Sequence, residues 1–200
     1  MDIQKYIHEC LKQLSALGID VLDRENELMS QMMRMPSDIL ADMEKGQIFG
    51  LLLDNIGAFY SIDEFQFSSN QMYSFDLERF DTSMMYTHFL MGVISITNGD
   101  LDIKDIIEDT SKIDFENGRG IHTICFQCNG KTYQYDAISH YDWFDTKVLS
   151  FLGQVVKEQN TGKYLYAASD GWQNCILFYN TEAWAKELND TTDILKLEQL

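Results

Sequence analysis

Between residues 121 and 138 the sequence reads Ile121-His-Thr-Ile-Cys-Phe-Gln-Cys128, Asn129-Gly130, Lys131-Thr-Tyr-Gln-Tyr-Asp-Ala-Ile138. Two runs rich in aromatic and β-branched residues flank an Asn-Gly dipeptide, which suits the positive φ angles of a type I′ turn. This pattern predicts a β-hairpin. Residues 163–169 and 172–179 flank Asp170-Gly171 in the same way and predict a second hairpin.

Helical patterns surround the hairpins. An apolar stripe from Trp143 to Val155 follows the first hairpin, and Thr181 can cap a helix with Trp184 and Leu188 beneath it after the second. Upstream, residues 73–78 alternate like a half-buried strand, and a helix is expected from Asp81 or Thr82 to Asn98-Gly99. The order predicts a small antiparallel sheet of hairpins with helices packed on one face.

The first 57 residues have a different, helical texture. Asp2 can cap a helix that ends at Gly18, a second helix is expected over residues 20–34, and a third from Ser37 to Gly46. Residues 47–57 fit a buried helix or a strand, because a short apolar run has no diagnostic period. We therefore predict an α+β protein with a helical N-terminal subdomain, residues 1–57, and a main domain, residues 58–200.

Charge and composition exclude several classes of protein. The 200 residues carry a formal charge of −17, which would repel a nucleic-acid backbone and an anionic membrane surface. There is no apolar run of the roughly 20 residues needed to cross a bilayer, and residues 1–5 lack a signal-peptide pattern. We expect a cytoplasmic protein whose four cysteines are reduced.

Two apparent metal motifs lack the required geometry. Cys125 and Cys128 form a C-x-x-C, but residues three apart on a strand point to opposite faces and cannot share a tetrahedral zinc ion. The acidic run from Asp100 to Asp105 lacks the glycine and the glutamate of a calcium loop. No metal or other cofactor is therefore expected.

One group of residues suggests acid–base chemistry. His140 is close in sequence to Asp142 and Asp145, and a histidine oriented by a carboxylate is a recurrent catalytic arrangement. No serine or cysteine stands in a nucleophile elbow, and such residues also occur as ordinary capping groups. We expect no enzyme. The alternative is a small-molecule-binding or hydrolytic domain with a site around His140 and Asp142.

The acidity is uneven along the chain. Residues 61–109 contain ten acidic and two basic residues, among them Asp63, Glu64 and Arg79. If Ile103, Ile106 and Ile107 anchor a short helix, the aspartates between them form a ridge on its other side, which is either a solvated face or a docking surface for a basic protein. Exposed aromatic residues would add affinity; Trp172 is expected to be partly exposed, and Trp143 and Trp184 to belong to the core. The predicted partner-binding residues are Asp100, Asp102, Asp105, Glu108, Asp109, Tyr141 and Trp172.

Two segments carry a resemblance. Tyr141-Asp-Trp143-Phe144-Asp145 and Leu165-Tyr-Ala-Ala-Ser-Asp170-Gly171-Trp172, in a small acidic chain, look like bacterial immunity proteins of polymorphic-toxin and contact-dependent inhibition systems. The resemblance implies a protein that binds and blocks a cognate toxin, often a basic nuclease, without catalysis. It assigns no functional residue. A structural or adaptor subunit is the third possibility.

Overall fold

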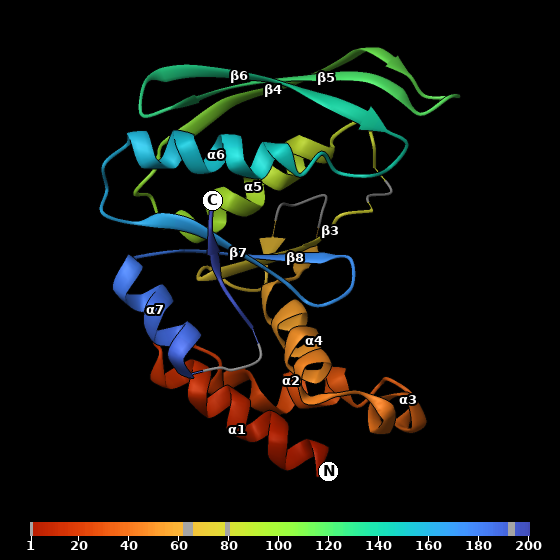
Figure 1. The fold of residues 1–200 in the computed structure, drawn as a ribbon, viewed down its shortest axis with the longest axis vertical. Coiled ribbons are helices and arrows are strands. Elements are labelled where there is room, and N and C mark those ends of the chain that lie inside the picture. Colours follow the sequence, from red (N-terminus) through yellow and green to blue (C-terminus); the bar gives the residue numbers. More distant parts are fainter. Residues whose placement is uncertain (1, 62–65, 79–80, 192–194) are drawn as a thin grey trace.

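A computed structural model describes residues 2–61, 66–78, 81–191 and 195–200, and it confirms the α+β class. The elements form four layers (Figure 1). A three-stranded antiparallel sheet, β4-β5-β6, covers helices α5 (Met85–Thr97) and α6 (Lys147–Glu158). Beneath these helices lies a four-stranded antiparallel sheet, β3-β8-β7-β9, and the N-terminal helices cover its other face together with α7 (Glu182–Thr191).

The central sheet is buried on both faces. It consists of β3 (Met72–Asp76), β8 (Asn174–Asn180), β7 (Tyr164–Ser169) and the short β9 (Glu198–Gln199). In β8, Cys175, Leu177 and Tyr179 face α5 and α6, whereas Ile176 and Phe178 face the N-terminal helices. The strand predicted over residues 73–78 is confirmed as β3, but the prediction that it is half-buried is wrong, because Met72 to Phe75 are all buried between two helical layers.

The N-terminal helices follow the sequence pattern with shorter bounds. They are α1 (Ile3–Ala16), the 3₁₀ turn η1 (Leu22–Arg24), α2 (Glu25–Met32), α3 (Ser37–Asp42) and α4 (Lys45–Gly57). Asp2 caps α1, since its carboxylate accepts a hydrogen bond from the Lys5 amide. The ambiguous residues 47–57 are helical, and a capping box between Glu44 and Gln47 fixes the start of α4.

The outer sheet contains the first predicted hairpin. Its strands are β4 (Ile103–Asp114), β5 (Arg119–Cys128) and β6 (Lys131–His140). Asn129 and Gly130 join β5 to β6 with φ angles of 48° and 79°, which confirms the two-residue turn with both residues at positive φ. The two hairpins lie in different sheets, with α5 and α6 between them.

The second hairpin, β7–β8, has a longer connection than predicted. β7 ends at Ser169 and β8 begins at Asn174, so residues 170–173 form the loop, and only Gly171 among them has a positive φ. The Asp170 carboxylate accepts hydrogen bonds from the backbone amides of Trp172 and Asn174. This side chain organises the loop in place of a tight turn.

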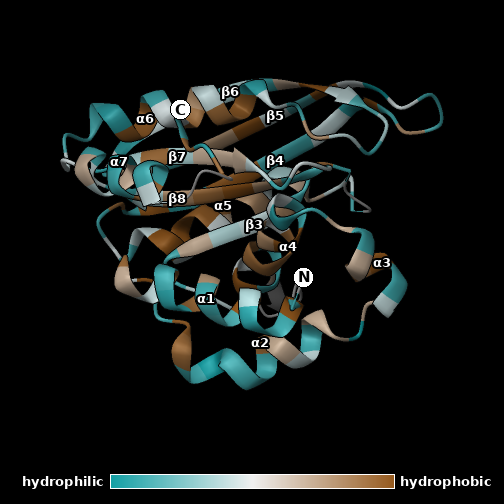
Figure 2. Cartoon of the chain, turned by 60° about the horizontal axis from the view of Figure 1, so that its bottom comes forward, coloured by the Kyte–Doolittle hydropathy of each residue, from teal (hydrophilic) through white to brown (hydrophobic). Residues whose placement is uncertain are grey.

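Two hydrophobic clusters hold the layers together. One lies between the outer sheet, α5, α6 and the central sheet, and the other joins α1, α2 and α4 to the central sheet and α7. Figure 2 shows the contrast between the apolar α4 and α5 and the polar outer surface of α1. No helix in the described ranges combines the length and apolar character needed to cross a membrane.

The N-terminal helices share the second cluster with β7, β8 and α7. The division into a helical subdomain, residues 1–57, and a main domain, residues 58–200, stays a prediction. Truncation would test whether residues 1–57 fold alone. Strands β1 (Phe59–Ser61) and β2 (Gln66–Phe67) form a small separate ladder after α4. Three charged residues of the predicted acidic region, Asp63, Glu64 and Arg79, lie outside the described residues.

Candidate interaction surface

The predicted acidic ridge does not exist as a helical face. Residues 103–114 form strand β4, and its pairing with β5 is interrupted at two places, between Lys104 and Ile107 and between Asp109 and Lys112. Asp105 lies in the first irregularity with a φ of 52°. The expected helix was wrong because these β-bulges shift the side-chain alternation and give the three isoleucines a helix-like spacing.

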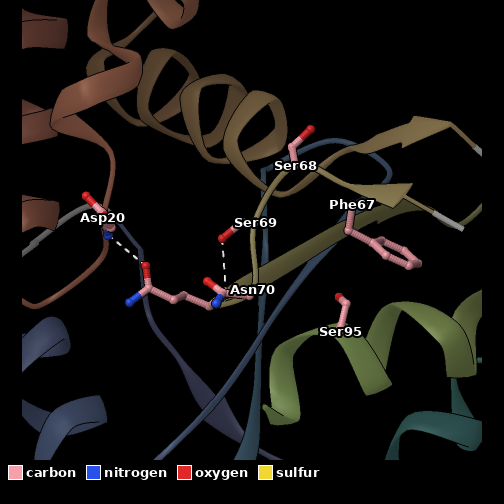
Figure 3. A pocket seen from close by; sticks show the side chains of 7 residues that line it. Asp20, Phe67, Ser68, Ser69, Asn70 and Ser95 are labelled. Carbon is pink, nitrogen blue, oxygen red and sulfur yellow. Dashed lines mark hydrogen bonds between the residues drawn. The ribbon is translucent and has the colours of Figure 1, made fainter.

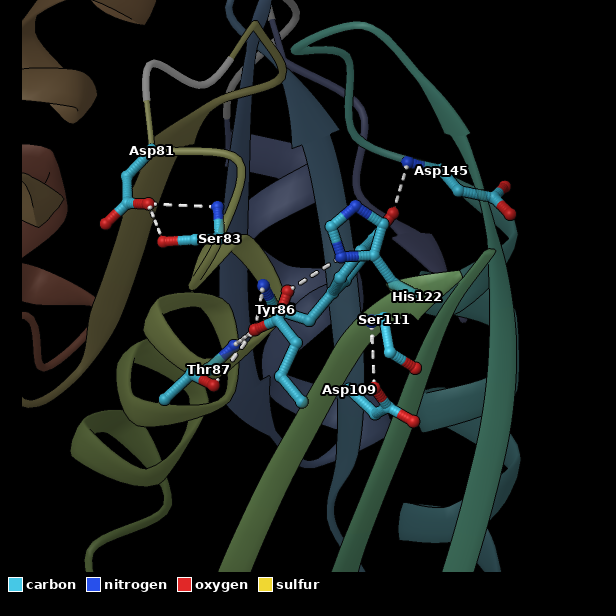
Figure 4. A network of polar contacts seen from close by, with 9 residues as sticks. Asp81, Ser83, Tyr86, Thr87, Asp109, Ser111, His122 and Asp145 are labelled. Atoms are coloured by element: carbon cyan, nitrogen blue, oxygen red, sulfur yellow. Dashed lines mark hydrogen bonds and ion pairs between the residues drawn. The ribbon is translucent and has the colours of Figure 1, made fainter. Parts of the chain in front are cut away.

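Glu108 is a structural residue that faces the protein interior. Its side chain is 3% exposed, and Oε1 lies 3.0 Å from Nδ1 of the buried His122 (Figure 4). Oε2 accepts hydrogen bonds from the backbone amides of Tyr86 and Thr87 and from the Thr87 hydroxyl. Glu108 thus caps the N-terminus of α5 from the outer sheet, and it is not available to a partner.

The remaining predicted acidic residues are exposed, but their positions differ. Asp100 pairs with Lys163, and Asp102 pairs with Lys104. These two residues and Asp105 lie at the beginning of β4, whereas Asp109 lies in its middle. Strand geometry places Asp105 roughly 25–30 Å from the other end of β4. The structure therefore does not bring these residues together with Tyr141 and Trp172.

Exposed aromatic residues gather at that other end of the fold. Phe115 is 54% exposed in the β4–β5 turn, and Tyr141 is 57% exposed directly after β6. The Tyr141 amide donates a hydrogen bond to the Gly118 carbonyl, and its ring packs so closely on Gly118 that a Cβ there would lie 2.3 Å from Cδ1. Tyr141 is thereby held against the β4–β5 turn.

Backbone contacts connect Tyr141 to the second hairpin. Trp143, 42% exposed, bridges to His140 and to Glu78. The Phe144 amide donates to the Leu77 carbonyl, and the Leu77 amide donates to the carbonyl of Gln173, the neighbour of Trp172. Trp172 is 50% exposed, as predicted, whereas the prediction that Trp143 is a core residue was wrong.

We call the four residues Phe115, Tyr141, Trp143 and Trp172 the aromatic end. The β4–β5 turn, the end of β6 and the β7–β8 loop all lie on the right-hand side of Figure 1. Ile121 and Ile138 extend this surface on the outer face of the sheet, where they are cross-strand partners and are both exposed. These exposed side chains come from three segments at the same end of the fold: the β4–β5 turn, the connection after β6 and the β7–β8 loop.

The charged residues near the aromatic end are mainly acidic. The exposed or half-buried carboxylates are Asp76, Glu78, Asp114, Glu116 and Asp142, and the described basic residues of the same segments are Lys112 and Arg119. Gln173 donates a hydrogen bond to Asp76, and Asn117 donates to Asp114. Neither contact neutralises the carboxylate, so this end has a negative potential that suits a basic partner.

The suggested acid–base group does not form a recessed site. His140 is exposed at the end of β6, where its ring lies edge-on to that of Tyr141. The Asp145 carboxylate accepts hydrogen bonds from the backbone amides of Ile138 and Lys147, so it fixes the connection between β6 and α6. This role is that of a capping residue. None of the three hollows described in the structure is lined by His140 or Asp142.

A polar hollow lies elsewhere, beside β2 and β3. It measures about 370 Å³ and is lined by Asp20, Phe67, Ser68, Ser69, Asn70, Gln71 and Ser95 (Figure 3). Gln71 accepts a hydrogen bond from the Asp20 amide and donates one to the Gly18 carbonyl, and Ser69 accepts from the Gln71 amide. These groups are used to connect α1 to the sheet. The hollow is shallow and polar, and it contains neither His140 nor Asp142.

The cysteines have the geometry expected of a strand. Cys128 is buried and Cys125 is partly exposed on the opposite face of β5, so they do not converge. All four cysteines are free. Within the described part of the chain, no group of three or more histidine, cysteine, aspartate or glutamate residues has the geometry to hold a metal ion.

Sequence reasoning found Tyr141 and Trp172 but missed Phe115, Ile121 and Ile138 as surface residues. A signal existed for the isoleucines, because the inward alternation of His122, Ile124 and Phe126 places Ile121 on the other face of β5. Comparison of the chain with protein-family models, with curated proteins and with solved structures found no match.

Proposed function

We propose that this chain is a non-enzymatic protein-binding protein that docks a basic protein partner through the aromatic end. The observation that carries the proposal is the presence of four aromatic side chains, each 42–57% exposed, at one end of the fold. Tryptophan and tyrosine contribute most of the binding energy at protein interfaces. Exposing them to water has no benefit for folding, because burial of apolar surface is what stabilises a fold.

Charge supports the choice of a basic partner. The chain has a net charge of −17, and the carboxylates around the aromatic end outnumber the described basic residues there. Such a field accelerates encounter with a positively charged protein and disfavours acidic competitors. The aromatic residues then supply short-range affinity.

The immunity-protein resemblance adds a more specific proposal, that the partner is a toxin which this chain neutralises. Tyr141 and Trp143 belong to one of the two segments that carry the resemblance, and Trp172 ends the other. Blocking a toxin requires tight binding and no catalytic group. A protein that uses rigid aromatic anchors on a strand end and a short loop has this property.

The test uses the protein encoded next to this chain as the candidate partner. Its affinity for the wild type and for Trp143→Ala and Trp172→Ala is measured by calorimetry. Each substitution is expected to weaken binding at least about tenfold, since interface tryptophans commonly contribute about 2 kcal/mol or more. The matched control is Ile39→Ala, which removes an exposed apolar side chain from α3 and should leave the affinity unchanged.

Two outcomes would contradict the proposal. Equal affinities for the wild type and both tryptophan variants would exclude the aromatic end, and binding that does not weaken with added salt would exclude a charge-guided contact. A structural or adaptor subunit is the second candidate, because the same exposed aromatic residues could join copies of this chain. Sedimentation of the isolated protein distinguishes the two: a stable oligomer that Trp143→Ala dissociates favours the subunit.

A further inference from the structure

Two acidic side chains, Asp54 and Asp170, are buried against each other where α4 meets the β7–β8 loop. Asp54 is 8% exposed and Asp170 is 5% exposed. Gly50 and Asp54 are one helical turn apart on the same face of α4, and a Cβ on Gly50 would lie 2.7 Å from the Asp170 carbonyl oxygen. The loop thus presses directly on α4.

The hydrogen bonds of the two carboxyl groups are unequal. Asp170 Oδ1 accepts from two backbone amides, those of Trp172 and Asn174, at 2.8 and 3.1 Å. Asp54 Oδ1 accepts one hydrogen bond, 2.6 Å long, from the Ser74 hydroxyl, while Oδ2 is buried without a partner at normal hydrogen-bond distance. Burial raises the pKa of Asp54, and this effect exceeds the opposing hydrogen bonds of the Ser74 hydroxyl and the Asn174 side chain, which lower it.

The groups around the pair do not supply a compensating charge. Cys175 of β8 lies near the pair but on the other face of the central sheet, and burial raises the pKa of its thiol to about 12, so it stays neutral. Of the titratable residues on α1, only Cys10 is buried, and its charged neighbours are Glu9 and Lys45. The buried residues of α2 are apolar. Within the described ranges, neither aspartate has a lysine, arginine or histidine at ion-pair distance.

We propose that Asp54 and Asp170 share one proton inside the fold, and that loss of this proton releases the loop that carries Trp172. Two adjacent carboxylates without a cation repel each other strongly in a buried place. Asp54 belongs to a core helix, whereas Asp170 belongs to a four-residue loop whose Trp172 is exposed. Repulsion is therefore relieved by movement of the loop away from α4.

The direction of the effect follows from the geometry and from the titration of Asp54. Burial, followed by the negative charge of Asp170, raises the pKa of Asp54 to about 7. The loop is held while Asp54 is protonated, at acidic pH, and is released as the pH rises through neutrality. This makes the position of one aromatic side chain sensitive to the pH range in which cells operate.

The test compares tryptophan fluorescence of the wild type with that of Trp172→Phe between about pH 5 and pH 9, because the difference isolates Trp172. A transition near pH 7 is expected. Asp54→Asn keeps the shape of the side chain but cannot ionise, and it should abolish the transition. Asp102→Asn, at the far end of β4, is the control and should leave it intact.

Infrared spectroscopy keeps the proposal testable if the Asp54 variant folds poorly. The wild type should show the carbonyl band of a protonated carboxyl group at about pH 6, and the band should disappear by about pH 8. A wild type without this band, or an Asp54→Asn variant with an unchanged fluorescence transition, would overturn the proposal. Neither measurement requires a partner, so failure here leaves the proposed docking function untouched.

Discussion

The carboxylate of Glu108 and the imidazole of His122 form a buried pair, with Oε1 and Nδ1 3.0 Å apart. The pair joins neighbouring strands of the outer sheet, and the second oxygen of Glu108 caps α5. Tyr86 stacks edge-on against His122, and its hydroxyl accepts a hydrogen bond from the Asp145 amide. One acidic residue thus connects the outer sheet to the helical layer below it.

Removal of Glu108 should destabilise the fold. Glu108→Ala leaves two backbone amides, the Thr87 hydroxyl and His122 without their shared acceptor, and a buried network broken in this way costs about 3 kcal/mol. Urea denaturation measures the loss. The matched control is Asp109→Ala on the exposed side of β4, which should change the free energy of unfolding by less than about 0.5 kcal/mol. Equal effects of the two substitutions would show that the network contributes nothing.

The inward orientation of Glu108 could not be predicted from the sequence. An acidic residue among other acidic residues gives no local sign that it faces inward, because its partners are 14 and 21 or 22 residues away in the chain. The bulges of β4 hid the strand pattern as well. By contrast, the hairpin around Asn129-Gly130 and the helix capped by Asp2 were predictable, since each depends on neighbouring residues only.

The close approach of α5 to β3 provides a second stability prediction. A Cβ on Gly92 would lie 2.2 Å from Cε1 of the buried Tyr73 ring, so Gly92→Ala forces a core side chain to move. Overpacking of this kind costs about 1–3 kcal/mol, which exceeds the gain from the higher helix propensity of alanine. Ser150→Ala, on the exposed face of α6, is the control and should be neutral or slightly stabilising. A Gly92→Ala protein as stable as the wild type would refute this packing argument.

The acidic residues of β4 separate the two possible docking surfaces. If the aromatic end binds the partner, Asp100→Asn and Asp102→Asn should change its affinity less than about twofold, because both lie far from that end and already have lysine partners. Glu116→Gln and Asp142→Asn should slow association and reduce its salt dependence. Stopped-flow kinetics at two salt concentrations measures both effects. The reverse pattern would restore the docking site that the sequence predicted.

The aromatic end could be predicted only in part, for a physical reason. Trp143 begins a helical stripe in the sequence, which indicates burial, yet the chain turns at His140 and leaves it beside Glu78. That neighbour is 65 residues earlier in the chain, so no local pattern contains it. Trp172 was predictable because a residue beside a glycine turn between two strands is exposed in most hairpins. Local sequence patterns predicted the exposure of a single residue such as Trp172. Which exposed residues lie near one another depends on contacts between segments that are distant in the sequence.

The buried Asp54 makes the global stability of the protein depend on pH. Its pKa is raised to about 7 from an ordinary value of 3.8 by burial and by Asp170. Below about pH 4 the carboxyl group is protonated in both the folded and the unfolded protein, and its contribution to the free energy of unfolding is complete. Between about pH 4 and pH 7 it ionises only in the unfolded protein, so this contribution declines as the pH rises. The decline is at most about 1.4 kcal/mol per pH unit, and other groups with lowered pKa, such as Asp81, act below this window.

We therefore predict how the difference in the free energy of unfolding between the wild type and Asp54→Asn changes with pH. Urea denaturation at about pH 5, 6, 7 and 8 should show the free energy of unfolding of the wild type falling relative to that of Asp54→Asn, with the gap levelling off above pH 7. Asparagine keeps an acceptor for the Ser74 hydroxyl and adds no charge beside Asp170. If the two proteins have parallel curves over the whole range, Asp54 is ionised in the fold throughout, and the unpaired oxygen must have found a cation or a donor that relieves its burial.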